Sequence, residues 1–151
     1  MLEVRLARAE AMLDIIALEA NYARAWDYGN HIEWAKVFTA DGVFEMAAVG
    51  DRPALKVEGR DQLSAFCKDF TSNFTGVHVP GLPLLEIDGD EAMGHLHFQF
   101  VAVGRLAANH TMSRTACGQY DVRYRRTDEG WRMVHRLEKA FSNARSEFFD
   151  F

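Results

Sequence analysis

The sequence predicts an α+β fold, in which N-terminal helices pack against a cone-shaped, curled antiparallel sheet (an α+β barrel) that encloses a pocket. Apolar residues recur at helical spacing in the first 27 positions, whereas alternation with a period of two dominates after position 77. Turn sequences at 88–90 and 128–130 join neighbouring strands as hairpins. Helices followed by an antiparallel meander are typical of α+β domains and not of βαβ folds.

The helices are predicted from apolar faces and glycine stops. In the first helix an apolar stripe advances by alternating steps of three and four residues. Its members are Leu6, Ala9, Leu13, Ile16, Ala20 and Ala23. Gly29-Asn30 ends this helix, and residues 31–38 form a short second one. A third helix follows Gly59. Its apolar face contains Leu63, Phe66, Cys67, Phe70 and Phe74.

The strands are predicted to build the pocket. Two short strands cover 43–48, opened by a turn at 41–42, and 55–58. Four long strands cover 77–87, 92–106, 109–126 and 131–141. On each of two neighbouring strands, alternate positions form one face of mostly apolar and small residues. On strand 92–106 these are Leu96, Phe98, Phe100 and Ala102, and on strand 109–126 they are Met112, Ala116, Gly118, Tyr120 and Val122. If both faces point inward, their small residues leave space beside bulky aromatic ones.

Composition limits the class of protein. The chain is 48% hydrophobic and 26% charged, and we expect residues 1–151 to form one domain. A net charge of −5 argues against a nucleic-acid partner, and no apolar run reaches membrane-spanning length. Cys67 and Cys117 form no CxxC motif, and no secretory signal begins the chain. We therefore expect reduced thiols and a cytoplasmic protein.

Asp27 is the first candidate catalytic residue. The apolar stripe of the first helix takes its next step onto this position. A carboxylate on a buried face is costly unless it is paired or hydrogen-bonded. The alternative is structural, with Asp27 capping the Gly29-Asn30 helix end or bonding backbone amides of the next helix.

His78, at the start of the first long strand, is the second candidate. Imidazole titrates near neutral pH, so a histidine held by a carboxylate can accept a substrate proton and pass it on. A core histidine bonded to a backbone carbonyl is the structural alternative. The distance along the chain between His78 and Asp27 leaves open whether the two meet.

Two other sets of residues leave alternatives open. His95 and His97 share a strand face, but they lack further ligands and lie opposite the predicted pocket face, so we expect no metal and no cofactor. His135 and Arg136 are adjacent in the last strand, so one of them faces inward. An inward Arg136 favours an anionic leaving group or oxyanion in the pocket, and an outward one belongs to a charged strand surface.

A family resemblance adds to these inferences. The order of elements, the entry to the third helix at 58–61 and the late hairpin at 122–131 resemble the SnoaL-like branch of the nuclear transport factor superfamily. Within that branch the chain is most similar to the scytalone dehydratases, and hexachlorocyclohexane dehydrochlorinases are a second relative. The resemblance covers nearly the whole chain.

The resemblance implies a lyase in which His78 removes a proton from carbon while Asp27 holds its tautomer. It also implies a substrate pocket, for which we predict Trp26, Met46, Phe98, Phe100, Tyr120 and Arg136. Trp26 and Met46 stand where scytalone dehydratases have two carbonyl-polarising tyrosines. Ala102 falls near their second pocket histidine and Tyr120 near their pocket asparagine. The aromatic tail at 147–151 resembles their pocket cover.

We therefore predict a cofactor-independent, dehydratase-like lyase that acts on a small hydrophobic cyclic or aromatic carbonyl compound. The alternatives are an isomerase or polyketide-cyclase-like enzyme, and a non-catalytic ligand-binding domain. We also expect a homo-oligomer that packs through the outer sheet face, either a trimer as in the nearest relatives or a dimer as elsewhere in the superfamily. The substrate itself and its pathway stay open.

Overall fold

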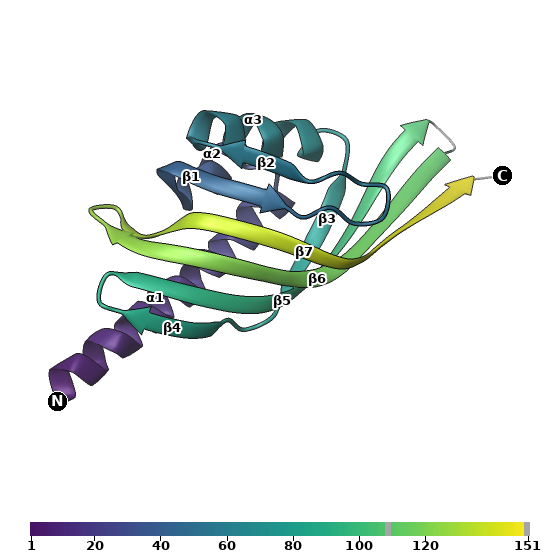
Figure 1. Cartoon of the computed structure of the whole chain (residues 1–151). Coiled ribbons are helices and arrows are strands. Elements are labelled where there is room, and N and C mark those ends of the chain that lie inside the picture. The colour runs from purple at the N-terminus through teal and green to yellow at the C-terminus, as the bar shows by residue number, and fades with distance from the viewer. Residues whose placement is uncertain (108–109, 150–151) are drawn as a thin grey trace.

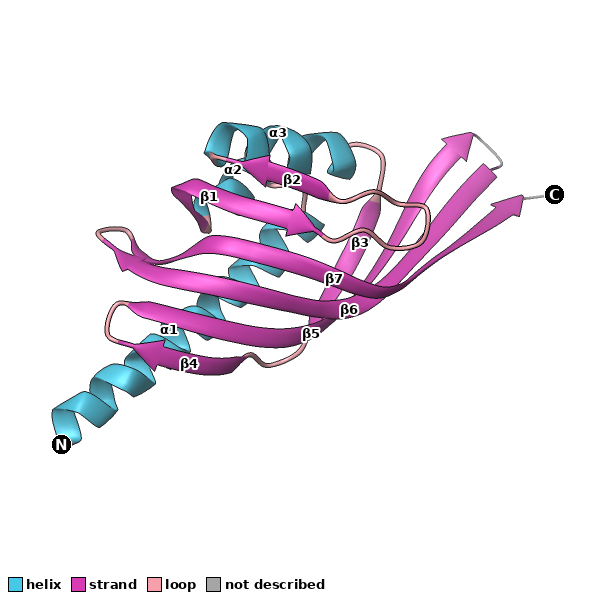
Figure 2. Cartoon of the chain, in the orientation of Figure 1, coloured by secondary structure: helices cyan, strands magenta, loops and turns pink. Residues whose placement is uncertain are grey.

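The computed structural model describes the backbone of residues 1–107 and 110–149, and the side chains of residues 1–104 and 110–141. The elements in chain order are α1 (Leu2–Asp27), α2 (His31–Lys36), β1 (Phe38–Met46), β2 (Leu55–Glu58), α3 (Arg60–Thr71), β3 (Thr75–Pro80), β4 (Leu84–Asp88), β5 (Glu91–Ala107), β6 (His110–Thr127) and β7 (Gly130–Phe149). The long strands β5, β6 and β7 cross the molecule side by side, and the helices gather on one side of them (Figures 1 and 2). The predicted α+β class is confirmed.

The sheet is mixed and open, which corrects the prediction of an antiparallel barrel. Its strand order is β2-β1-β7-β6-β5-β3, and β4 also pairs with β5. β1 runs parallel to β7, whereas the other pairs are antiparallel. Hairpin turns set the direction only of strands that are consecutive in the chain. β1 and β7 are far apart in sequence, so no turn signal reveals their parallel pairing.

Several strand boundaries differ from the prediction, and β7 continues to Phe149 beyond its expected end at 141. The strand expected at 77–87 is two strands, because the segment Gly81–Pro83 separates β3 from β4 and prolines interrupt strand ladders. β1 begins at Phe38, where the predicted second helix was still continuing. Its register with β7 shifts between Phe38 and Val43, so Asp41-Gly42 lies in an irregular stretch within β1 and not in a turn before it.

The buried face of α1 is not the predicted stripe. Leu6 and Leu13 are exposed, and the first turns of α1 project beyond the rest of the molecule (Figure 1). The helix buries instead Ala11, Ile15, Leu18, Glu19, Tyr22, Ala23 and Trp26. The apolar members of this buried face also recur at steps of three and four residues, so spacing alone does not decide which of the two stripes is buried. Among the residues that the structure describes, no helix is both long and apolar enough to cross a lipid bilayer.

The predicted inner face of the sheet is confirmed. Leu96, Phe98 and Ala102 of β5 are buried, as are Met112, Tyr120 and Val122 of β6. The tail is different from the expected pocket cover. Residues 147–149 continue β7 in register with residues 110–112 of β6, and residues 150–151 lie outside the described part. In Figure 1 these strand ends extend away from the helices.

Candidate active site

Asp27 and His78 are in direct contact. The His78 ring nitrogen Nδ1 lies 2.7 Å from Oδ1 of Asp27. The backbone N–H of His78 also donates to the same carboxylate, at 2.9 Å from Oδ2 and 3.1 Å from Oδ1. Asp27 is the last residue of α1, and His78 lies in the edge strand β3. The carboxylate therefore joins the end of the helix to the edge of the sheet.

This contact determines which ring nitrogen of His78 carries the proton. A carboxylate only accepts hydrogen bonds, so Nδ1 of His78 carries the proton and Nε2 carries the lone pair. Burial lowers the pKa of His78 below its ordinary value, although the Asp27 carboxylate raises it in part. The side chain of His78 is only 7% exposed. The ring is thus neutral near pH 7 and is able to accept a proton at Nε2.

His78 lines a cavity with a volume of about 230 Å³. The cavity is lined by Tyr22, Trp26, Phe44, Met46, Arg52, Phe66, Phe70, His78, Phe98, Phe100, Arg114, Ala116, Tyr120 and Glu138. The His78 ring lies 4.4 Å from the Phe100 ring, and Trp26 and Tyr22 meet it edge-on at 6.1 and 5.9 Å. The walls are therefore mainly aromatic, with a few polar groups.

Five of the predicted pocket residues line this cavity: Trp26, Met46, Phe98, Phe100 and Tyr120. The sixth, Arg136, points inward but lies behind the wall. Its guanidinium carbon is 3.8 Å from the ring centre of Tyr22 and 3.7 Å from that of Tyr120. His135 points the other way and bonds Glu45 at 3.0 Å. Arg136, and not His135, therefore points to the interior, and the alternative of an outward Arg136 is wrong.

Arg136 belongs to a buried polar cluster. Its Nη1 lies 2.8 Å from both carboxylate oxygens of Glu19, and the Tyr124 hydroxyl donates to Glu19 at 2.6 Å. Burial is the largest cause that raises the pKa of the phenols of Tyr22, Tyr120 and Tyr124 above its ordinary value. Arg136 thus fixes two tyrosine rings of the cavity wall from behind.

Sequence reasoning missed the polar end of the cavity. Glu138 is 8% exposed and lines the cavity from β7, and Arg52 reaches it from the loop between β1 and β2. Arg52 Nη1 lies 3.5 Å from Glu138 Oε1, and Arg52 Nη2 donates to the carbonyl of Ala47 at 3.2 Å. The signal for Glu138 was its spacing, because residues two apart in a strand share a face with the inward Arg136.

His95 and His97 lie on the exposed face of β5, as predicted. Nδ1 of His95 lies 2.7 Å from Asp121, whose carboxylate also bonds Lys139 and Gln119. These bonds hold the pKa of Asp121 at about 2, although its burial acts in the opposite direction. In the described part of the chain, no three His, Cys, Asp or Glu side chains are arranged to hold a metal ion.

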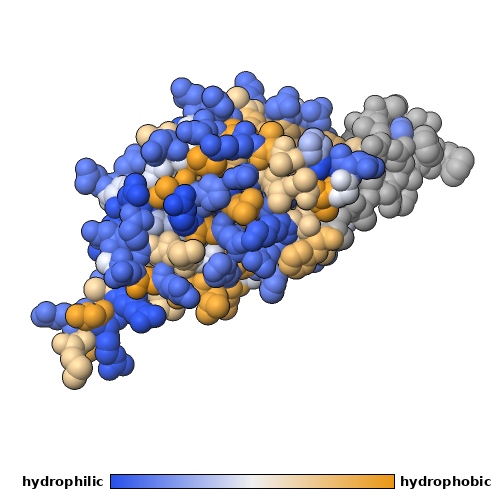
Figure 3. All heavy atoms as spheres, in the orientation of Figure 1, coloured by the Kyte–Doolittle hydropathy of each residue, from blue (hydrophilic) through white to orange (hydrophobic). Residues whose placement is uncertain are grey.

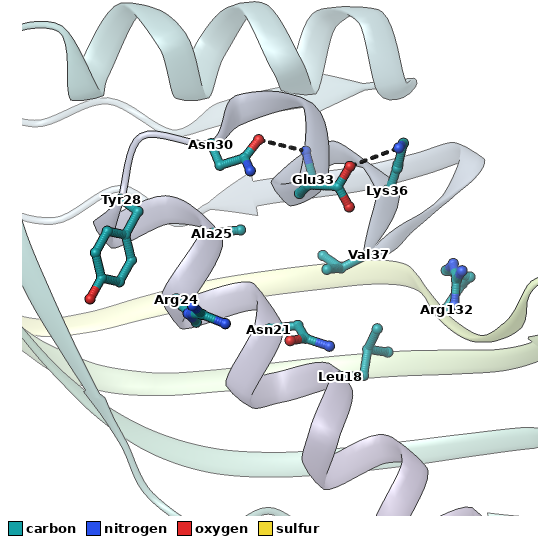
Figure 4. Close-up of a pocket in the computed structure, with 10 residues that line it drawn as sticks. All are labelled: Leu18, Asn21, Arg24, Ala25, Tyr28, Asn30, Glu33, Lys36, Val37 and Arg132. Carbon is teal, nitrogen blue, oxygen red and sulfur yellow. Dashed lines mark hydrogen bonds and ion pairs between the residues drawn. The ribbon is translucent and has the colours of Figure 1, made fainter.

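A second hollow, of about 420 Å³, lies outside the aromatic cavity between α1, α2 and β7. Figure 4 shows its lining residues: Leu18, Asn21, Arg24, Ala25, Tyr28, Asn30, Glu33, Lys36, Val37 and Arg132. Its polar groups serve local structure, since Asn30 caps α2 at the Glu33 N–H and Glu33 pairs with Lys36. Although it is larger, it contains neither Asp27 nor His78, so the aromatic cavity is the candidate site.

A family model described as the SnoaL-like domain matches residues 7–137. No curated protein matches the sequence. Among solved structures, the chain is similar to Rv3472 from Mycobacterium tuberculosis, a protein of unknown function that was solved as a point variant. The two share 28% identity and a TM-score of 0.74, over 91% of this chain and 75% of the other.

Other neighbours show the fold alone. A putative scytalone dehydratase from Novosphingobium aromaticivorans is 16% identical, with a TM-score of 0.75 over 95% of this chain and 91% of the other. A type 2 hexachlorocyclohexane dehydrochlorinase is also 16% identical, with a TM-score of 0.72 over 94% and 90%. A nuclear transport factor 2-like protein from Salmonella enterica is 17% identical, with a TM-score of 0.75 over 89% and 94%. The family model over residues 7–137 confirms the predicted SnoaL-like family.

The contact between Asp27 and His78 predicts a linked titration. The Asp27 carboxylate favours the imidazolium, so Asp27→Asn should lower the pKa of His78 by about one unit or more. NMR titration of the His78 ring in both proteins measures this shift. Asp121→Asn is the control, because it removes a carboxylate from His95 and should leave His78 unchanged. An unaltered His78 titration in Asp27→Asn would refute the coupling.

The buried pair of Glu19 and Arg136 predicts a strong dependence of stability on both partners. Glu19→Leu leaves the guanidinium buried without its counter-charge, and we expect a loss of about 3–5 kcal/mol in the free energy of unfolding. The double variant Glu19→Leu/Arg136→Met should recover much of it. Urea unfolding measures these values. Glu33→Gln, which breaks an exposed pair, should cost at most about 1 kcal/mol, and an equal loss there would contradict the account.

Proposed function

Because the chain belongs to the SnoaL-like domain family, we propose that it is a cofactor-independent lyase. It removes a proton and a hydroxyl-type leaving group from a small cyclic or aromatic carbonyl compound. The observation that carries this proposal is the 2.7 Å contact between His78 Nδ1 and Asp27, at the wall of an aromatic cavity.

In the proposed reaction His78 is the base. Its Nε2 takes a proton from the carbon next to the substrate carbonyl, and the Asp27 carboxylate stabilises the imidazolium that forms. A neutral, buried histidine suits this role, because its lone pair is available near pH 7. The phenol of Tyr120 is 1% exposed and lines the same cavity. We propose it as the donor that polarises the carbonyl oxygen.

The cavity restricts the substrate. Its volume of about 230 Å³ is below the roughly 300–1,000 Å³ typical of pockets for drug-sized ligands. Flat rings from α1, α3 and the sheet favour a flat ligand of one or two rings. Two of the structural neighbours carry names that denote loss of water and of hydrogen chloride, which supports elimination as the reaction class.

Proton abstraction is testable without the natural substrate. We expect the wild-type protein to accelerate exchange of the C2 hydrogens of 1-tetralone in D2O, measured by mass spectrometry. His78→Ala should reduce the rate by about 10²-fold or more, and Asp27→Asn should also reduce it. His97→Ala, on the exposed face of β5, is the control. Wild-type exchange no faster than in buffer, or full activity of both variants, would contradict the proposed base and favour a binding domain.

The product distinguishes elimination from isomerisation. A lyase forms a product lighter by the mass of water or of a hydrogen halide, whereas an isomerase or cyclase leaves the mass unchanged. Both reactions use the same base, so exchange at C2 is common to them. Mass analysis of the product from a cyclic β-hydroxyketone therefore decides between the two enzyme classes.

We propose further that the protein self-associates through the outer face of β3 and β5. Val77 and Val101 are cross-strand neighbours there and are 57% and 38% exposed. Val79 and Val103 extend this apolar patch along the same face. On the face turned to the viewer in Figure 3, hydrophilic residues predominate and apolar residues form patches among them. Burial of the valine patch against a second copy would remove it from water.

This patch predicts a change of oligomeric state on substitution. Val101→Glu should convert the wild-type oligomer to a monomer, because it places a charge in the centre of the proposed interface. Light scattering coupled to size-exclusion chromatography measures the mass. Leu13→Glu is the matched control, since Leu13 is an exposed apolar residue of α1. A monomeric wild type, or a Val101→Glu protein with unchanged mass, would exclude this interface.

A further inference from the structure

Glu138 is a buried carboxyl group that the role of His78 leaves unexplained. It is 8% exposed and lines the aromatic cavity together with His78. Carboxyl groups are rarely buried to this degree unless they are paired. Its described side-chain partner is Arg52, at 3.5 Å through one nitrogen and one oxygen, a long and single contact. By comparison, Glu19 bonds Arg136 through both oxygens at 2.8 Å.

The sheet register holds Glu138 in this position. Glu138 lies between Met46 of β1 and Tyr120 of β6, its neighbours on the two adjoining strands. Its backbone carbonyl accepts from the Ala47 N–H at 2.9 Å. β7, which carries Glu138, is three places from β3, which carries His78, in the curled sheet. The two side chains therefore line one cavity from different strands of the sheet.

The surroundings of Glu138 favour its neutral form. Burial raises the pKa of Glu138 above that of an ordinary carboxyl group. Three arginines act against this rise: Arg52 from the loop after β1, Arg114 from β6 and Arg136 from β7. The charge of Arg136 is already offset by Glu19. Glu138 thus keeps its proton to a higher pH than an exposed glutamate does.

We propose that Glu138 is the general acid of this site and protonates the leaving hydroxyl while His78 removes the proton from the adjacent carbon. This inference rests on the proposed lyase function. The electron pair of the broken C–H bond forms the new C=C bond, and the C–O bond breaks toward oxygen. That oxygen takes the Glu138 proton and leaves as water. Exchange with solvent then removes the proton from His78 and returns one to Glu138.

Whether the reaction needs Glu138 depends on the leaving group of the substrate. A hydroxide ion is a poor leaving group, so elimination of water needs a proton donor, whereas elimination of chloride does not. Glu138 is therefore required only for the hydroxyl substrate. Arg52 acts as a positioning residue through its contact with the carboxyl group of Glu138.

The test compares two leaving groups on one ring. With 3-hydroxy-1-tetralone, which yields fluorescent 1-naphthol after loss of water, we expect Glu138→Gln to lower the elimination rate by about 10²-fold or more. With 3-chloro-1-tetralone, the same variant should eliminate chloride within a few-fold of the wild-type rate above buffer. Exchange of the C2 hydrogens of 1-tetralone in D2O should also stay within a few-fold.

Glu45→Gln is the matched control. Glu45 is a carboxylate of the neighbouring strand β1, and it pairs with His135 away from the cavity. This variant should retain wild-type rates in all three assays. Circular dichroism and urea unfolding of both variants show whether Glu138→Gln is folded. If it is not, Arg52→Gln, which loosens the carboxyl group, should lower loss of water more than loss of chloride.

Each other outcome counts against the proposal. Equal losses with both leaving groups assign Glu138 a structural role only, and undiminished loss of water excludes it as the acid. A wild-type protein that exchanges the C2 hydrogens but does not eliminate hydroxyl refutes the acid while leaving His78 as a base. A wild-type protein that neither exchanges the C2 hydrogens nor eliminates hydroxyl contradicts the proposed lyase function and, with it, the role of Glu138.

Discussion

The three hydrogen bonds that Asp27 accepts from His78 connect the two halves of this fold. One carboxylate at the last residue of α1 binds both the backbone N–H and the ring of a residue in β3. β3 is the outer strand of an open sheet, so its outward N–H groups lack a strand partner. Asp27 supplies that partner for one of them. The same contact attaches the end of α1 to the edge strand and orients the candidate base.

A buried ion pair supports another part of the cavity wall. Glu19 and Arg136 lie in the core, and the guanidinium is held between the rings of Tyr22 and Tyr120. A buried charge is tolerated only when it is paired, so this arrangement fixes the geometry of both rings. The wall of the cavity is thus held at two places, at His78 by Asp27 and at the rings of Tyr22 and Tyr120 by Arg136.

The sequence predicted those parts of the structure that follow from local patterns. Alternation revealed the inner faces of β5 and β6, and Gly29-Asn30 marked the end of α1. Asp27 was predicted from a stripe whose members Leu6 and Leu13 are exposed in the structure. Asp27 nevertheless contacts His78, and its catalytic role stays a prediction. The parallel pairing of β1 with β7 and the inward turn of Glu138 depend on contacts between distant segments, which periodicity does not contain.

The tautomer of His78 is the measurement that tests the central claim most directly. The account predicts that, at neutral pH, the proton is on Nδ1, bound to Asp27, and that Nε2 carries the lone pair. Nitrogen-15 NMR of the imidazole distinguishes the two nitrogens by their chemical shifts. A protonated Nδ1 with a bare Nε2 would support the base. A ring protonated on Nε2 would contradict it, because no lone pair would then face the cavity.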